Sequence, residues 1–143
     1  MITLKIVTPE GIISEISGVQ SVTLPTETGV ITIKEDHLPL ISLLQPGEIE
    51  ITNEKGTEIL SVSTGMIEVR EESMVYILAD TAERAEDIDI ERAEEARRKA
   101  EEFLEEKDIL ADVDFARLQA KMEKEMARIR VGRKYRKLAP PPQ

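Results

Sequence analysis

The first 80 residues follow a period of two, which is the pattern of strands with one buried face. Near the start, Ile2, Leu4 and Ile6 alternate with Thr3 and Lys5. Further β-branched or apolar runs cover 19–24, 29–33, 47–52, 57–63, 66–70 and 74–79, with turn-forming residues between them at 9–11, 25, 46–47, 53–56 and 65. Eight or nine short strands at this spacing predict an antiparallel β-sandwich or a flattened barrel.

After residue 80 the spacing becomes helical. In a first helix, Asp89 stands where an N-cap is expected, and one face carries Ala93, Ala96, Ala100, Phe103 and Leu104. Residues 107–112 interrupt the pattern and predict a connection. A second helix, running to about residue 137, presents on one side Phe115, Leu118, Met122, Met126 and Ile129.

These two patterns predict an α+β protein: an N-terminal antiparallel β-sandwich followed by a C-terminal hairpin of two antiparallel helices. The expected division is a β body over 1–83 and a helical hairpin over 84–137. Prolines at 140–142 cannot continue a helix, so 138–143 is expected to be a disordered tail.

The alanine-rich face of the first helix buries little apolar area, at about 25 cal/mol for each Å². A hairpin with such a seam is weakly held. Stretched end to end, about 45 helical residues would span roughly 70 Å. The sequence leaves two interpretations open, a hairpin that undocks as a switch and a permanently folded one.

Charge is unevenly placed in this chain, whose net charge is −10. Residues 1–112 hold 10 Lys and Arg against 26 Asp and Glu, whereas 113–143 hold 9 against 3. An acidic body with a basic arm favours docking of the arm on an acidic protein surface; the alternative is a solvated helix that happens to be basic. Nucleic acid is disfavoured, because the body would repel phosphate and the arm has only Tyr135 for stacking.

The residues offer little for catalysis. The sequence has no Cys, which excludes disulfides and thiolate metal sites, and no Gly-rich phosphate loop of the GxxxxGK type. His37 is the only histidine, so no zinc ligand set or catalytic triad is predicted around it. No signal peptide or run of roughly 18 apolar residues is present. We therefore expect no catalytic residues, no metal site and no required cofactor.

Several strings, taken together in order and spacing, resemble the epsilon subunit family of bacterial-type F-type ATP synthase from Leu4 to about Val131. They are TPEG at 8–11, SVTLP at 21–25, HLPLI at 37–41, PG at 46–47, EV at 68–69, ILADTAERAEDID at 77–89, DVDF at 112–115 and ARIRV at 127–131. The family has a sandwich of ten strands followed by a helical hairpin, which agrees with the pattern above.

The resemblance implies a non-catalytic rotor subunit of the central stalk. Its sandwich would bind the gamma subunit and rest on the ring of c subunits, and so help to couple ion flow to ATP synthesis. Association with the membrane, at the cytoplasmic face of the bacterial plasma membrane, would come only through the complex. The c-ring-facing loop would include Gly29, Val30 and His37. This loop lacks a second glycine and a Pro-Gly pair usual in the family, with Thr32, Glu35 and Asp36 in their places.

The resemblance also implies that the hairpin inhibits ATP hydrolysis. When extended, its second helix would present basic residues to an acidic segment of a beta subunit. The candidates are Arg117, Lys121, Lys124, Arg128, Arg130 and Arg133.

Some family members bind a regulatory ATP through a motif of the form Ile/Leu-Asp-x-x-Arg-Ala, which stands at 88–93 here. The positions that match the nucleotide site are Glu83, Ile88, Asp89, Arg92, Ala93, Lys99, Lys124 and Arg128. Lys99 and Lys124 replace arginines and lose the planar two-point fork. The alternative is an N-capped helix start with ordinary surface charges.

Two other classes remain for comparison. The first is an unrelated adaptor whose sandwich docks one protein and whose hairpin docks another. The second is the mitochondrial equivalent of the family, called delta, which is expected to carry a basic targeting segment. A standalone enzyme is disfavoured by the missing nucleophile, metal cluster and cofactor loop.

Overall fold

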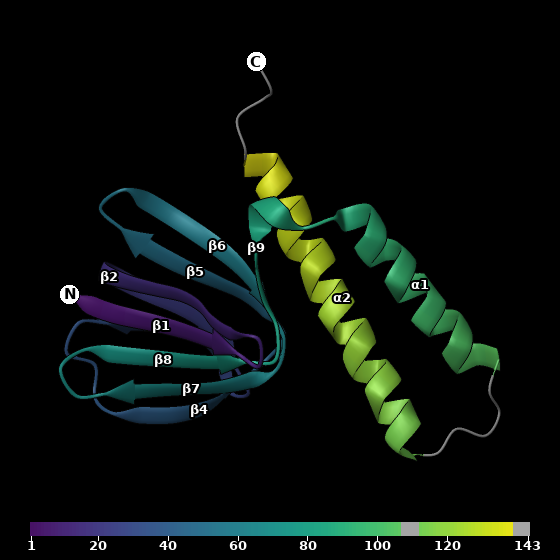
Figure 1. Cartoon of the computed structure of the whole chain (residues 1–143), viewed down its shortest axis with the longest axis horizontal. Coiled ribbons are helices and arrows are strands. Elements are labelled where there is room, and N and C mark those ends of the chain that lie inside the picture. Colours follow the sequence, from purple (N-terminus) through teal and green to yellow (C-terminus); the bar gives the residue numbers. More distant parts are fainter. Residues whose placement is uncertain (107–111, 139–143) are drawn as a thin grey trace.

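The computed structural model describes residues 1–106 and 112–138, in a β-sandwich beside two long helices (Figure 1). The strands are β1 (Ile2–Thr8), β2 (Gly11–Thr26), β3 (Gly29–Lys34), β4 (Leu40–Leu44), β5 (Gly47–Asn53), β6 (Gly56–Val62), β7 (Gly65–Arg70), β8 (Met74–Ala79) and β9 (Ala82–Arg84). A single 3-10 turn, η1 (Ala85–Asp87), leads to α1 (Ile90–Glu106) and α2 (Asp112–Leu138). The predicted fold class is confirmed.

The nine strands of the described residues form one sheet in the order β1-β8-β7-β4-β2-β5-β6-β9, with β3 paired to β2. A further pairing of β1 with β2 closes the sheet on itself. All pairs are antiparallel except β1 with β8, which run parallel. Closure removes most free strand edges, which are otherwise sites of unwanted pairing.

Strand β2 explains why the chain has nine strands where the resemblance implies ten. Its first part pairs with β1, and its second part pairs with β3 and β5. Between the two parts lies Gly18, with φ of +73°, a conformation that favours glycine. One continuous strand therefore pairs with different neighbouring strands along its two parts.

Pro25 does not form a turn, as its position had predicted, but lies inside β2. Proline has no backbone N–H to donate to a neighbouring strand. The carbonyl of Pro25 accepts a hydrogen bond of 3.0 Å from the backbone N of Gln45. The turn falls instead at 27–28, between β2 and β3.

Alternation along the strands produces the core. In β1 every second residue is buried, and the buried apolar residues of the sandwich come from all strands except β9. They are Ile2, Leu4, Ile6, Val19, Val22, Leu24, Ile33, Leu44, Ile49, Ile51, Leu60, Val62, Ile67, Val69, Val75, Ile77 and Ala79. Aliphatic residues fill this core, as the low aromatic content of 3% requires.

The helices pack on each other and, over the C-terminal part of α2, on β5, β6 and η1. Asp89 is the N-cap of α1, since its Oδ1 accepts a hydrogen bond of 3.0 Å from the backbone N of Arg92. The predicted cap is confirmed. Residues 107–111 of the predicted connection and 139–143 of the predicted tail lie outside the described residues.

The predicted apolar side of α2 is only partly right. Ile129 is buried, but Phe115 and Met126 are exposed. The buried residues are instead Glu125, Ala127, Ile129, Val131 and Gly132. This spacing of about two arises because the C-terminal part of α2 lies between α1 and the sandwich and is covered on both sides, whereas a periodicity argument assumes one buried stripe.

Candidate functional site

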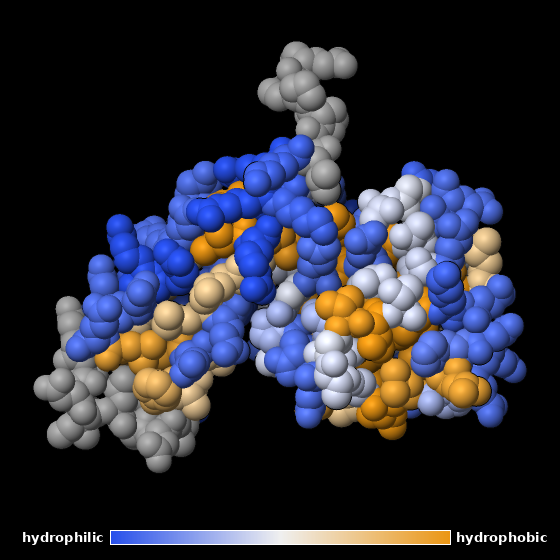
Figure 2. Space-filling model, turned by 180° about the vertical axis from the view of Figure 1, so that it is seen from behind, coloured by the Kyte–Doolittle hydropathy of each residue, from blue (hydrophilic) through white to orange (hydrophobic). Residues whose placement is uncertain are grey.

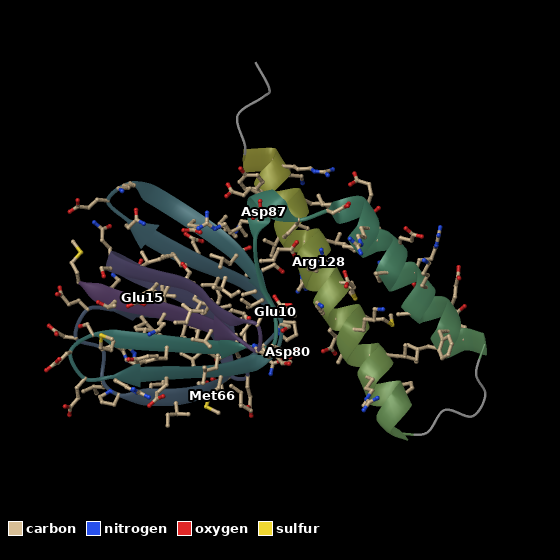
Figure 3. All side chains as sticks on the ribbon, viewed as in Figure 1. Glu10, Glu15, Met66, Asp80, Asp87 and Arg128 are labelled. Atoms are coloured by element: carbon tan, nitrogen blue, oxygen red, sulfur yellow. The ribbon has the colours of Figure 1, made fainter. Side chains whose placement is uncertain are left out.

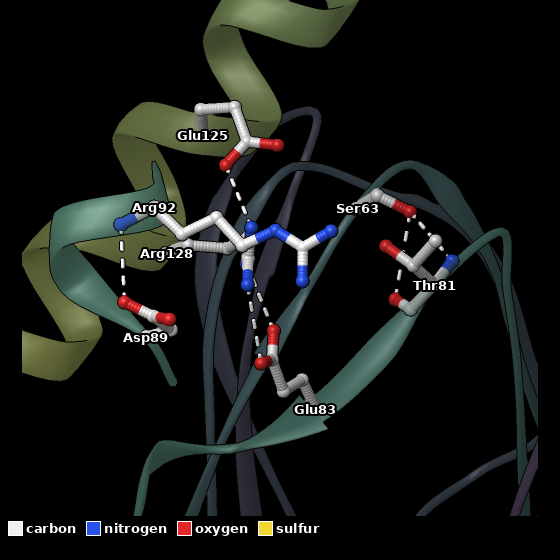
Figure 4. A network of polar contacts seen from close by, with 7 residues as sticks. All are labelled: Ser63, Thr81, Glu83, Asp89, Arg92, Glu125 and Arg128. Carbon is white, nitrogen blue, oxygen red and sulfur yellow. Dashed lines mark hydrogen bonds and ion pairs between the residues drawn. The ribbon is translucent and has the colours of Figure 1, made fainter. Parts of the chain in front are cut away.

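The junction between the sandwich and the helices contains a network of ion pairs centred on Arg128 of α2 (Figure 4). The Arg128 Nε donates to Glu83 Oε2 at 2.8 Å and its second guanidinium nitrogen donates to Glu83 Oε1 at 3.3 Å, so the two planar groups meet at two points. The remaining nitrogen donates to Glu125 Oε2 at 2.8 Å. Glu83 belongs to β9, so this network joins α2 directly to the last strand.

The network is largely shielded from solvent. The side chains of Arg128 and Glu125 are 18% and 5% exposed. Burial lowers the pKa of Arg128, but its hydrogen bonds to Glu83 and Glu125 outweigh burial and raise that pKa above its ordinary value. The guanidinium is therefore held in its charged form by two carboxylates. Glu125 was not predicted, because a glutamate three residues before an arginine resembles an ordinary surface pair.

Beside this network, Thr81, the residue before β9, is hydrogen-bonded to Ser63, the residue after β6. The backbone N of Thr81 donates to Ser63 Oγ at 2.8 Å, and the backbone N of Ser63 donates to the carbonyl of Thr81 at 3.1 Å. These bonds fix the backbone two residues before Glu83, and so help to position Glu83 beside α2.

The predicted nucleotide motif lies at the start of α1. Ile88 and Ala93 are buried in a second apolar cluster with Ala85, Ile90, Ile129 and Val131. Asp89 is occupied as the helix cap, and Arg92 is exposed and forms no ion pair with any described residue. Figure 4 shows the side chain of Arg92 extending away from its own cap.

The structure brings only part of the predicted nucleotide set together. Glu83 and Arg128 are paired, and Ile88 and Ala93 share a cluster. Lys99 lies further along α1 and pairs with Glu95 at 3.2 Å. Lys124 is half-buried on α2, and no ion pair or hydrogen bond joins its side chain to another residue within the described part of the chain.

The basic residues predicted to meet a beta subunit fall into two groups. Arg117, Lys121 and Arg130 are exposed on α2, and Lys124 is half-buried. Arg128 is held in the network, and Arg133 pairs with Glu94 of α1. In the compact hairpin the chain's own carboxylates therefore neutralise part of the basic arm.

The predicted c-ring-facing loop is divided between two ends of the sandwich. Gly29, with φ of +128°, closes the β2–β3 turn, and Val30 beside it is 73% exposed. His37 follows the far end of β3, where one of its ring nitrogens lies 2.6 Å from the carbonyl oxygen of Leu38. Because β3 has six residues at about 3.3 Å each, its length separates the two parts.

A second feature, absent from the predicted sites, is an apolar outer face on the sandwich. Residues paired across strands share one face of a sheet. The register aligns Leu43 of β4 with Met66 of β7, Met66 with Leu78 of β8, Leu78 with Val7 of β1, and Val7 with Ile12 of β2.

Ile41, two residues before Leu43, lies on the same face and is 69% exposed. Figure 3 shows Met66 on the outside of the sandwich, and Figure 2 shows apolar surface on the sandwich among hydrophilic surroundings. We define the apolar outer face as Val7, Ile12, Ile41, Leu43, Met66 and Leu78. Alternation could have indicated this face, since these residues stand where a wet sheet would have polar ones.

The described residues provide neither a metal centre nor a membrane-spanning helix. Within 1–106 and 112–138, no group of three or more His, Asp or Glu side chains is arranged to hold a metal ion. Among the same residues, neither helix is long and apolar enough to span a membrane.

Two family profiles match consecutive parts of the chain. Residues 1–85 match the profile described as ATP synthase, Delta/Epsilon chain, beta-sandwich domain, and residues 86–132 match ATP synthase, Delta/Epsilon chain, long alpha-helix domain. The chain belongs to the ATP synthase delta/epsilon family. The order of its sandwich and helices is that of the two family domains.

Relatives within the family indicate the epsilon type. The ATP synthase epsilon chains of Staphylococcus aureus strains JH9 and Newman are each 36% identical to this chain over 131 residues, which is 92% of this chain and 96% of the relative. The chain is therefore an epsilon-type subunit of an ATP synthase, and such subunits are non-catalytic.

Solved structures agree on the fold. A chain in the Euglena gracilis mitochondrial ATP synthase, seen with OSCP, F1 and the c-ring in rotational state 1, matches with a TM-score of 0.73 and 21% identity, over 88% of this chain and 78% of that one. A chain in the Tetrahymena thermophila mitochondrial ATP synthase, from its central stalk and c-ring, matches with a TM-score of 0.67 and 11% identity, over 92% of this chain and 96% of that one. At these identities the likeness establishes the shared fold alone.

Proposed function

We propose that the sandwich binds the gamma subunit of the central stalk through the apolar outer face, and so turns with the rotor. The exposed row of Leu43, Met66 and Leu78 carries this proposal. A contiguous apolar patch on a sheet that would otherwise be wet marks a protein interface, because its burial removes apolar surface from water. Membership of the epsilon family supports gamma as the protein that covers it.

The same proposal gives the sandwich a second contact, with the ring of c subunits. The exposed Val30 at the β2–β3 turn and His37 at the far end of β3 are the candidates, and they lie at different ends of the sandwich. A subunit that holds both gamma and the ring transmits rotation driven by ion flow to the catalytic subunits. It would lie at the cytoplasmic face of a bacterial plasma membrane through this contact, as the bacterial relatives favour.

The gamma contact is tested by one charge on the apolar outer face. Met66→Glu is expected to weaken capture of the cognate gamma subunit about tenfold or more, because a carboxylate would be buried without a partner at a central contact. The matched control is Thr57→Glu, an exposed residue of β6 outside this face, which should bind gamma like the native chain. Pull-down with titrated gamma measures both. Equal binding by the two variants would contradict this interface.

We propose further that the hairpin inhibits ATP hydrolysis when it extends. The burial of α2 supports this, because its buried residues among 115–137 all lie from Glu125 onward, while Arg117 and Lys121 are exposed. An extended α2 would also separate Arg128 from Glu83 and Arg133 from Glu94, whereas Glu125, which lies on α2 itself, would move with Arg128. The basic arm would then reach an acidic segment of a beta subunit, and the two surfaces would attract each other.

Truncation after Arg84 tests inhibition by the hairpin. This end point keeps β9, whose residues pair with β6, so the sandwich retains its sheet. The assembled complex with the truncated subunit is expected to hydrolyse ATP faster than the complex with the full chain. Capture of gamma by the truncated subunit is the control for assembly. Equal hydrolysis rates in two fully assembled complexes would rule out a regulatory hairpin.

A regulatory ATP at the junction is also proposed. Arg92 offers an exposed guanidinium without an ion pair among the described residues, at the N-terminal end of α1, where anions are favoured. Phosphate oxygens would compete with Glu83 for the fork of Arg128. Because these ligands come from both helices, bound ATP would favour the compact hairpin.

The nucleotide site is tested by thermal unfolding of the full chain. ATP at about 100 times its dissociation constant should stabilise the folded state by about 2.7 kcal/mol and raise the thermal midpoint, with a smaller effect of ADP. Arg92→Ala should abolish the shift, whereas Arg98→Ala, another exposed arginine of α1, should retain it. A melting curve that ATP leaves unchanged would contradict nucleotide binding.

A further inference from the structure

The C-terminal turns of α2 extend beyond the part of the chain that the family explains. The family's helical profile ends at residue 132, while α2 continues to Leu138. These added turns are strongly basic, with Arg133, Lys134, Arg136 and Lys137 in succession around Tyr135. Their contacts differ from those of a solvated helix end.

Gly132, the last residue that the family profile covers, allows α2 to approach the start of α1 closely. A Cβ atom at this position would lie 2.8 Å from Cγ1 of Ile90 and 3.1 Å from Cγ2 of Ile88. Only glycine fits this contact without displacing those side chains. Tyr135 then packs, half-buried, against the same apolar cluster.

Three cations of these turns pair with carboxylates on two other elements. Arg133 pairs with Glu94, and Arg136 pairs with Glu91 at 3.3 Å. Both glutamates lie on the first turns of α1. Lys134 pairs with Glu48 of β5. The segment therefore bridges both the other helix and the sandwich.

The electrostatic consequences agree with this geometry. The hydrogen bond to Glu48, together with the nearby Glu50, raises the pKa of Lys134. The pKa of Glu91 is lowered by a hydrogen bond with its backbone and by Arg136. All three pairs lie at the surface, so each is weak and each is screened by salt.

We propose that residues 132–136 form an electrostatic latch, which holds the hairpin closed on the sandwich and releases it when its three ion pairs are lost. The latch is added to the buried network of Arg128, and it acts on the same motion. When it opens, Arg133, Lys134 and Arg136 lose their carboxylates and join the exposed basic arm. Closing and docking on an acidic partner therefore compete for the same cations.

This inference rests on the proposed opening of the hairpin, but its test needs no other subunit. The chain has no native Cys, so the substitutions Gln45→Cys and Gln119→Cys allow two fluorophores to be placed, one before β5 and one on the exposed side of α2. Energy transfer between them reports the ratio of open to closed molecules in the full chain. A failure of the hairpin to inhibit ATP hydrolysis would instead appear in the hydrolysis rate of the assembled complex.

The triple substitution R133E/K134E/R136E is expected to raise the ratio of open to closed molecules about tenfold or more, since each exposed pair is worth a factor of about 1.5 to 5 and reversal adds repulsion. Adding E48K/E91K/E94K should restore closure, because the pairs re-form with opposite signs. A helix that had merely unfolded would not be rescued in this way.

The matched control is K34E/K55E/K137E. It changes net charge by the same amount at three exposed lysines, none of which pairs with a residue in 1–106 or 112–138. It should leave the ratio near that of the native chain. A triple variant that stays closed, or a control that opens equally, would overturn the latch.

Salt provides a test that requires only the two labels and no charge substitution. Raising sodium chloride from about 0.01 M to about 1 M shortens the Debye length from about 30 Å to about 3 Å, and should increase the open fraction of the labelled native chain. If energy transfer remains constant across this range, the latch is contradicted even if the reversed variant fails to fold.

Discussion

The two-point ion pair between Arg128 of α2 and Glu83 of β9 positions the second helix on the sandwich. A charge removed from water is costly unless it is paired and hydrogen-bonded. Arg128 satisfies Glu125 on one edge of its guanidinium and Glu83 of β9 on the other. The planar fork fixes the rotation of α2 relative to the sandwich, and α1 packs on the helix so placed.

In the compact hairpin, carboxylates of the sandwich and α1 neutralise several of the basic side chains of α2. The acidic body and the basic arm, separated along the sequence, come together at Glu83, Glu94, Glu91 and Glu48. The apolar contribution to closure is limited, because the helical seam contains Ala93, Ala100 and Ala127 rather than large residues. Ion pairs thus contribute much of the stabilisation of the closed form. An acidic partner can replace these pairs, because it offers carboxylates to the same cations.

The sequence predicted the architecture because period and capping are local properties. The alternation in β1, the Asp89 cap and the change to helical spacing after residue 80 all appear as expected. What it did not predict depends on distant neighbours. Pro25 inside β2, the exposure of Phe115 and the burial of Glu125 follow from which elements pack together, and no single window contains that information.

The candidate sites show the same division. The motif at 88–93 was located correctly at a helix start, but nothing in the residues around Arg128 indicates that two carboxylates already hold its guanidinium. Nor does the sequence show that β3 separates Val30 from His37. The apolar outer face was visible in principle, since Leu43, Met66 and Leu78 occupy outward positions of alternating strands, but only the register shows that they form one row.

The central claim is that Arg128 holds the hairpin on the sandwich as a unit that can open by itself. Hydrogen exchange of the native chain and Arg128→Met, resolved by segment, tests it most directly. The substitution is expected to accelerate exchange about a hundredfold or more in α2, because it leaves Glu125 buried without a partner, while the core strands β5 to β8 keep their protection. Unchanged exchange in α2, or equal acceleration in the helices and the core strands, would contradict it.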